Sequence, residues 1–436
     1  MLETLIAAWK LPDLRQRILF VFGAFAVYTV GLHIPVPGID HAKMEQLFSQ
    51  MGGVFGLVDV FSGGALRKFT IFAMGIVPYI NASIIMQLLV AAIPQWKELQ
   101  KEGETGRKEI AKRTRYLTVA LAFLQSLGIS ITLVRSQILT ANWWQLMVTA
   151  IVLTAGTMFL LWLGEQITDK GVGNGVSLII FASITASLPW QISKVWEAVA
   201  PLQAWMSLIL LVVVFLGTIV GIVYVTQAQR KIPIQHARRI VGMRQVGGHS
   251  SFLPLKIAMA GVIPIIFAIS LMLLPMTIVT AIPAVANAAS PEAGFPYYVR
   301  VAAQWLAPGD NALALLMYAI VIVIFTYFYT AVQFDVNDMA DNLKKYGSYI
   351  PGIRPGKPTA DYLDKVVSRI TFAGALFLAA VAIIQYIAPA FTGVDIGTFS
   401  LVGGTSLLIV VGVALDTMQS IEAQMLMRNY EGFLRE

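Results

Sequence analysis

The stretch TIFAMGIVPYINASIIMQLL, from Thr70 to Leu89, decides the fold class of this chain. It contains no Asp, Glu, Lys or Arg, and it has the roughly 20 residues that a helix needs to cross the hydrocarbon core of a membrane. About ten apolar stretches of this kind fill the chain. Because lipid offers the backbone no hydrogen-bond partners, each stretch is expected to be a helix. The sequence therefore predicts an all-α, polytopic membrane protein.

These stretches define ten predicted spans, a number that permits two five-helix halves of inverted topology. The halves would be residues 1–200 and 201–436. Pro78 in the second span and Pro264 in the seventh are expected to kink their helices, because proline removes a backbone hydrogen bond. The predicted spans are 18–34, 69–93, 116–134, 146–164, 176–192, 205–225, 257–282, 312–334, 370–387 and 401–415.

The composition argues against several classes of function. The 436 residues are 57% hydrophobic and 13% charged, against roughly 25% charged in a soluble domain. The chain has no cysteine, and its four histidines are too scattered for a convincing metal cluster. It shows no Ser/His/Asp set, no HExxH motif and no phosphate-binding loop. We therefore expect no enzyme, no cofactor and no metal, and the lack of carboxylates in the spans argues against proton coupling.

The basic residues orient the chain, because cytoplasmic loops of membrane proteins are rich in Lys and Arg. With the N-terminus inside, most of the 31 Lys and Arg residues are cytoplasmic, and so are both chain ends. Two cytoplasmic loops, 227–256 and 335–369, are long enough to favour a functional role. Their charges either orient the spans or, for the two loops together, form a docking surface. The exceptions outside are Lys43, Arg67, Lys68, Arg135, Lys194 and Arg300.

The first outside loop contains an apolar segment, VFGLVDVFSGGAL, from Val54 to Leu66. This segment is too short to span a membrane and too apolar for free solvent. It either packs as a surface loop, lies at the interface, or re-enters the bundle where protein or a water cavity surrounds it. The pair Gly63 and Gly64 would supply a hinge.

Three polar residues lie at membrane depth in the second span: Asn81, Ser83 and Gln87. Polar residues there usually bond across helices and hold a bundle together. The alternative is that they line a seam that opens.

Six long motifs, in order along the chain, resemble bacterial members of the SecY/Sec61-alpha family, which form the channel of the Sec protein translocase. The resemblance covers nearly the whole chain. The motifs are GIVPYINASIIMQLL from Gly75, GEQITDKGVGNG from Gly164, MAGVIPIIF from Met259, YTAVQF from Tyr329, ADNLKKYGSYIPGIRPG from Ala340 and GGTSLLIVVGVALD from Gly403.

The resemblance implies two pseudo-symmetric halves around a central hourglass pore, with a lateral gate between spans 2 and 3 on one side and spans 7 and 8 on the other. The implied pore ring is Ile76, Ile80, Ile180, Ile266, Ser270 and Ile409. The implied plug is 54–66, with Val54, Phe55, Leu57, Val58, Val60, Phe61, Gly63 and Gly64. The implied docking residues are Arg238, Arg239, Arg244, Arg354 and Lys357, and the gate residues are Asn81 and Gln87.

The same resemblance implies the partners and the location. The partners would be the SecE and SecG subunits, the SecA ATPase, the ribosome, signal peptides and nascent chains, membrane lipids, and the SecDF and YidC proteins. The location would be the bacterial plasma (inner) membrane, with both termini cytoplasmic.

Two functions remain open on the residues alone. A protein-conducting channel needs a waist without charge, because a narrow apolar constriction dewets and holds back ions while it can widen around a passing chain. A secondary transporter of a small solute, with inverted repeats, could bind its ion through backbone carbonyls. The two long basic loops favour the channel, since a carrier of small solutes does not need them.

Overall fold

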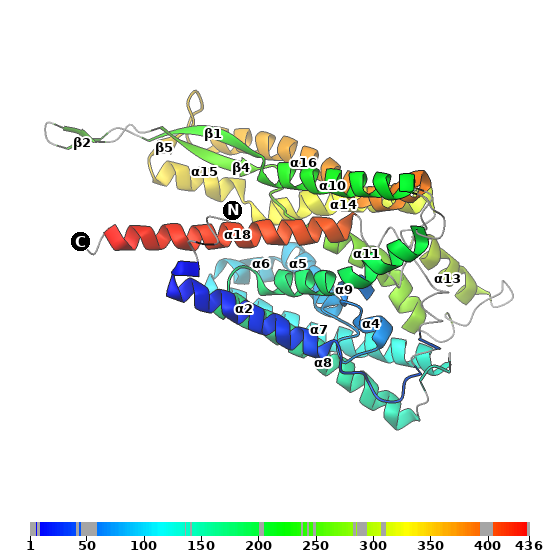
Figure 1. Ribbon diagram of the computed structural model, residues 1–436. Helices are drawn as coiled ribbons and strands as arrows, with labels where there is room; N and C mark the ends of the chain where they lie inside the picture. The colour runs from blue at the N-terminus through cyan, green and yellow to red at the C-terminus, as the bar shows by residue number, and fades with distance from the viewer. Residues whose placement is uncertain are drawn as a thin grey trace.

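The computed structural model shows a long helical bundle with a small sheet at one end (Figure 1). It describes residue 6 and residues 9–40, 43–44, 59–135, 137–139, 142–199, 205–236, 239–241, 244–246, 250–281, 285, 294–306, 311–392 and 404–433. The first half contains α2 (Pro12–Gly31), α4 (Ala65–Lys68), α5 (Val77–Ala92), α6 (Pro94–Lys101), α7 (Glu104–Arg135), α8 (Trp143–Lys170) and α9 (Gly175–Val199).

The second half is helical apart from five short strands. Its helices are α10 (Trp205–Gln227), α11 (Ile263–Ala281), α13 (Phe295–Leu306), α14 (Ala312–Gln333), α15 (Val336–Lys345), α16 (Lys357–Thr392) and α18 (Thr405–Phe433). Its strands are β1 (Gln229–His236), β2 (Arg239–Val241), β3 (Arg244–Val246), β4 (Ser250–Lys256) and β5 (Ser348–Tyr349).

The helical, multi-pass architecture is confirmed. Within the described residues, α7, α8, α9, α10, α14, α16 and α18 are each part of a helix long and apolar enough to cross a membrane. The pair α5 and α6, bent by 101°, makes an eighth candidate if it is one span. The helices α2, α5 and α11 coincide with the other predicted spans, so each predicted span overlaps one helix. The count of ten spans stays a prediction.

The expected kinks at Pro78 and Pro264 are wrong. Each proline is the second residue of its helix, α5 or α11, where the missing N–H costs no helical hydrogen bond. The residues just before each helix, which were predicted to belong to the span, form turns instead. A glycine with positive φ lies in each turn, Gly75 at 54° and Gly261 at 60°. Apolar composition is common to turn and helix here, so hydropathy alone could not place the boundary.

These two turns repeat one pattern in the two halves. GIVPYI from Gly75 and GVIPII from Gly261 share the glycine, the proline and the final isoleucine at the same spacing. In both, the residue after the glycine caps the helix by accepting two backbone N–H groups, as Ile76 does from Tyr79 and Ile80. The matching pattern supports the proposed division of the chain into two related halves.

The anchoring of the two turns also matches. The N–H of Ile71 donates to the carbonyl of Ile34, just after α2, at 3.1 Å. The N–H of Ile257 donates to the carbonyl of Ala228, just after α10, at 2.9 Å. Ile71 and Ile257 each lie four residues before the turn glycine. Each turn is therefore tied to the end of the first helix of its own half.

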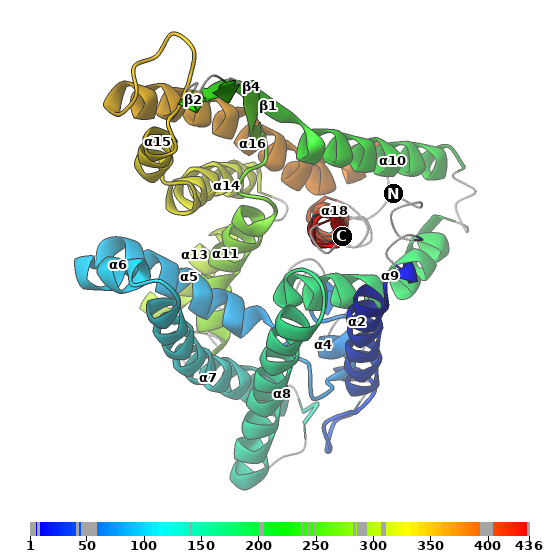
Figure 2. The same cartoon turned by 90° about the vertical axis from the view of Figure 1, so that its left-hand side faces the viewer.

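The two halves face each other across the bundle (Figure 2). The helices α2, α5, α7, α8 and α9 lie in the lower part of that view, and α10, α14 and α16 lie in the upper part. α18 lies between them and contacts α9, while α11 contacts α5, α7 and α14. The largest buried cluster joins side chains of both halves in the middle of the bundle.

Candidate functional site

Six predicted ring residues lie where the two halves meet. Ile76 precedes α5 and Ile80 belongs to it, while the others come from α9, α11 and α18. All six side chains are buried, and the isoleucines belong to one hydrophobic cluster that spans both halves. Ile80 and Ile266 occupy the same position in the repeated pattern. The complete set is Ile76, Ile80, Ile180, Ile266, Ser270 and Ile409.

The described part of the outer apolar segment belongs to the same core. Val60 and Phe61 are buried members of the cluster that contains the ring isoleucines. A Cβ added at Gly75 would lie 3.4 Å from the Cα of Ser62, so the segment lies close to the turn before α5. Among the other predicted plug residues, Gly63 and Gly64 adopt positive φ angles of 73° and 81°. Val54, Phe55, Leu57 and Val58 lie outside the described residues.

A carboxyl group shapes the turn of this segment. The backbone N–H of Arg67 donates to Asp59 Oδ1 at 2.8 Å, and the hydroxyl of Ser62 accepts from the N–H of Leu66. Asp59 is only 3% exposed. Burial raises the pKa of this carboxyl, while the Arg67 backbone N–H and guanidinium partly oppose the shift. The described part of the segment, from Asp59 onward, therefore has a defined turn rather than the fold of a loose surface loop.

The side of the bundle predicted to open is closed in this structure, because α11 contacts both α5 and α7. Asn81 is buried, and Gln87 donates to the hydroxyl of Ser83 at 3.2 Å. That bond lies within α5, so it does not join two helices as the first interpretation expected. Within the described residues, Asn81 Oδ1 and Gln87 Oε1 accept no hydrogen bond.

The two long basic loops fold into one unit, which the sequence did not predict. β1 pairs antiparallel with β4 of the same loop and with β5 of the other. The His236 ring joins the loops, with Nδ1 2.8 Å from Ser348 Oγ and Nε2 3.1 Å from Ser251 Oγ. Ile232, Leu255 and other apolar residues of the first loop share a core with residues of the second. Figure 1 places this sheet, α15 and the C-terminal end of α18 at one end of the bundle.

The predicted docking residues lie on this unit where the structure describes them. Arg354 is exposed in the turn after β5, and its carbonyl accepts a hydrogen bond from Thr359 at 2.8 Å. Lys357 is exposed at the start of α16. The backbones of Arg239 and Arg244 lie in β2 and β3, and Arg238 lies outside the described residues.

Comparison with known families decides the identity. The SecY family model matches residues 70–418. The chain belongs to the SecY family. The protein translocase subunit SecY of Streptomyces galbus is 43% identical over 100% of both chains. That of Halalkalibacterium halodurans is 44% identical, also over 100% of both. SecY proteins form protein-conducting channels and are not enzymes. This finding excludes the alternative that the chain is a secondary transporter of a small solute.

Solved structures agree on the fold. A SecY structure, described as showing that the plug domain stabilises the closed state of the translocation channel and maintains a membrane seal, is 20% identical with a TM-score of 0.65. Canine Sec61 in a ribosome–channel complex from the endoplasmic reticulum is 18% identical with a TM-score of 0.61. Each comparison covers 95% of this chain and 93% of the other.

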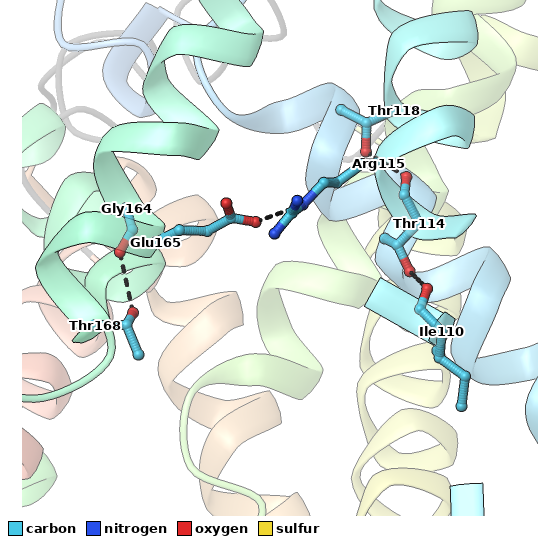
Figure 3. Close-up of polar contacts among 7 residues, drawn as sticks. All are labelled: Ile110, Thr114, Arg115, Thr118, Gly164, Glu165 and Thr168. Carbon is cyan, nitrogen blue, oxygen red and sulfur yellow. Dashed lines mark hydrogen bonds and ion pairs between the residues drawn. The ribbon is translucent and has the colours of Figure 1, made fainter. Parts of the chain in front are cut away.

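Two features of this SecY-family chain escaped the sequence analysis. One is the ion pair between Arg115 on α7 and Glu165 on α8, at 2.8 Å (Figure 3). Arg115 follows Thr114 on a helix whose threonines bond back to its own carbonyls, and Glu165 precedes Thr168, which does the same on α8. The sequence alone did not indicate this pair, because residues 50 positions apart meet only in three dimensions.

The second missed feature is a buried polar cluster on the outer segment. The hydroxyl of Tyr28, on α2, lies 2.8 Å from Ser183 Oγ on α9 and 3.1 Å from the carbonyl oxygen of Ser62. A tyrosine in an apolar span gives a weak sequence signal, since its ring fits lipid and core equally well.

Proposed function

We propose that this SecY-family chain conducts unfolded polypeptide through a waist made by its ring residues. The observation that carries the proposal is that five isoleucines from both halves belong to one buried cluster, together with Val60 and Phe61 of the outer segment. Branched aliphatic side chains offer no charge and no hydrogen bond. A narrow constriction of this kind excludes water and ions, yet nothing specific has to break when it widens.

A second part of the proposal concerns lateral release. Spans 2 and 3 correspond to α5 and α7, and spans 7 and 8 to α11 and α14. Separation of α11 from α5 and α7 would open the waist toward lipid. Signal peptides and membrane segments of nascent chains would leave there. Asn81 and Gln87, which keep unused acceptor atoms on α5, would line the opened seam.

The third part concerns the motor. The joined loops present exposed Arg354 and Lys357 next to a β-hairpin that carries further arginines. Such a basic surface suits an acidic or RNA-containing partner. Canine Sec61 is bound to a ribosome in its complex. We assign this surface to the SecA ATPase and the ribosome, with SecE and SecG as companion subunits and SecDF and YidC as accessory partners, in the bacterial inner membrane with both termini cytoplasmic.

Ion conductance in planar bilayers tests the waist. Ile80→Thr and Ile409→Thr keep a β-branched shape but add a hydroxyl that holds water. We expect the resting conductance to rise about tenfold, because the constriction then hydrates. Ile222→Thr, on α10 in the same cluster, is the matched control because it makes the same change at a buried isoleucine that is not one of the ring residues. Wild-type conductance in Ile80→Thr and Ile409→Thr would contradict the proposed waist. A rise in conductance from Ile222→Thr as large as that from the ring variants would contradict it too.

A further inference from the structure

The hydroxyl of Tyr28 joins three segments that are distant in sequence. It reaches from α2 to Ser62 in the outer segment and to Ser183 on α9, at 3.1 and 2.8 Å. Tyr28 is 1% exposed, so water does not compete for these bonds. A buried hydrogen bond between neutral groups therefore stabilises the fold here, and its loss would leave buried polar atoms without a hydrogen-bond partner.

The surroundings hold this hydroxyl in place. The Tyr28 ring stacks on Phe72 with centroids 5.9 Å apart and an interplanar angle of 2°. A Cβ added at Gly63 would lie 2.7 Å from the Tyr28 hydroxyl and 3.2 Å from the Cα of Ser183. The glycine is thus required both by its φ of 73° and by the close approach of α2 and α9.

A second contact holds Arg67, the residue directly after this segment, against the same helix. The Arg67 guanidinium carbon lies 3.6 Å from the centre of the Trp190 ring on α9. Ser183 and Trp190 both follow Ile180, a ring residue, along one helix. An outward shift of α9 that widened the waist would therefore strain both contacts to the outer segment.

We propose that Tyr28, Ser62 and Ser183 form a clasp that holds the plug segment closed and sets how readily the channel opens. The proposal rests on the proposed channel and on the plug role that the family resemblance implies for residues 54–66. Tyr28 is a positioning residue: it touches no passing polypeptide, and it acts by fixing the segment to α2 and α9. Loss of one such hydrogen bond should raise the open fraction about fivefold.

Tyr28→Phe tests the clasp, because it removes the hydroxyl and keeps the stacked ring. Tyr318→Phe is the matched control: Tyr318 is fully buried, and its hydroxyl has no hydrogen-bond partner among the described residues. We expect Tyr28→Phe to raise resting conductance about fivefold and Tyr318→Phe to leave it unchanged. In a chain that lacks Val54–Leu66, Tyr28→Phe should add nothing, because its partner is gone.

A second readout follows the segment directly. The chain has no cysteine, so Ala65→Cys introduces a single thiol at a fully buried position of the outer segment. In nanodiscs of the full-length chain with its co-purifying subunits, the rate of labelling by a charged maleimide measures how often the segment leaves its site. Tyr28→Phe should raise this rate about fivefold.

The outcomes separate the clasp from the plug. If the chain that lacks Val54–Leu66 conducts ions at rest while Tyr28→Phe matches wild type in conductance and labelling, the proposed clasp is wrong and the plug role is supported. If the deletion does not leak, the plug role is wrong, and the labelling rate still shows whether Tyr28 holds the segment. An equal effect of Tyr318→Phe would mean general loosening of the core and would overturn the clasp.

Discussion

The turn before α5 and the turn before α11 are built alike and serve opposite ends of the molecule. Both contain a glycine with positive φ, a proline at the second helical residue and a tie to the first helix of their half. The first turn continues from the outer segment and contacts Ser62 of that segment. The second follows β4 and therefore the first of the two long loops. The same turn pattern thus comes after the outer segment in one case and after that loop in the other.

The fit of the two turns differs in tightness. A Cβ at Gly156, on α8, would lie 2.0 Å from the carbonyl oxygen of Ile71. A Cβ at Gly374, on α16, would lie 2.6 Å from the carbonyl oxygen of Ile257. Each glycine belongs to the fourth predicted span of its half. The same close approach thus occurs at both turns, and it is tighter at the turn that follows the outer segment than at the turn that follows β4.

The largest expected effect comes from filling these contacts. Gly156→Ala should lower the free energy of unfolding by about 3 kcal/mol, since backbone cannot move aside as a side chain can. The decrease in the free energy of unfolding caused by Gly374→Ala should be about 1 kcal/mol smaller than that caused by Gly156→Ala. Thermal unfolding in detergent measures both.

Gly217→Ala on α10 is the control, because nothing lies within 4 Å of its added Cβ. It should be neutral or slightly stabilising, since alanine favours helix over glycine. If Gly156→Ala and Gly374→Ala lowered the free energy of unfolding equally, the two turns would not differ in how tightly they are packed.

The next effect concerns the two long loops, one of which precedes the second turn and pairs with the other through β1 and β5. Arg354→Glu should slow export of an unfolded precursor about tenfold or more, because it reverses charge at the proposed docking surface. Lys101→Glu, an exposed basic residue on α6 outside both loops, is the control and should change export little. The measurement is motor-driven uptake of precursor into proteoliposomes, with membrane insertion checked separately. Unchanged export would leave Arg354 as a topogenic charge only.

Hydropathy alone predicted the helical bundle, because a membrane requires long apolar helices and little else produces them. The resemblance in turn named five isoleucines that belong to one buried cluster, and their role as a pore ring stays a prediction. The features that the sequence analysis did not predict depend on tertiary contacts. Turns with apolar sequence look like helix, as at Ile76 and Val262. The pairing of β1 with β5 depends on a strand of only two residues, Ser348–Tyr349, which is too short to recognise. The contacts at Gly156, Gly374 and Tyr28 depend on segments that meet only in the folded chain.

The smallest expected effect is also the one that tests the equivalence of the turns. Pro78→Ala and Pro264→Ala should each lower the free energy of unfolding by about 0.4–1 kcal/mol, because proline at the start of a helix restricts the unfolded chain and breaks no helical bond. The helices should keep their direction. A proline inside a kinked helix would behave in the opposite way, since alanine there restores a hydrogen bond and removes a clash, which stabilises the helix. Because the two prolines hold the same place in the two halves, their measured costs in thermal unfolding should agree within a few tenths of a kcal/mol. A gain in stability at either position, or a clear inequality between them, would show that the two turns are alike in sequence but not in physical role.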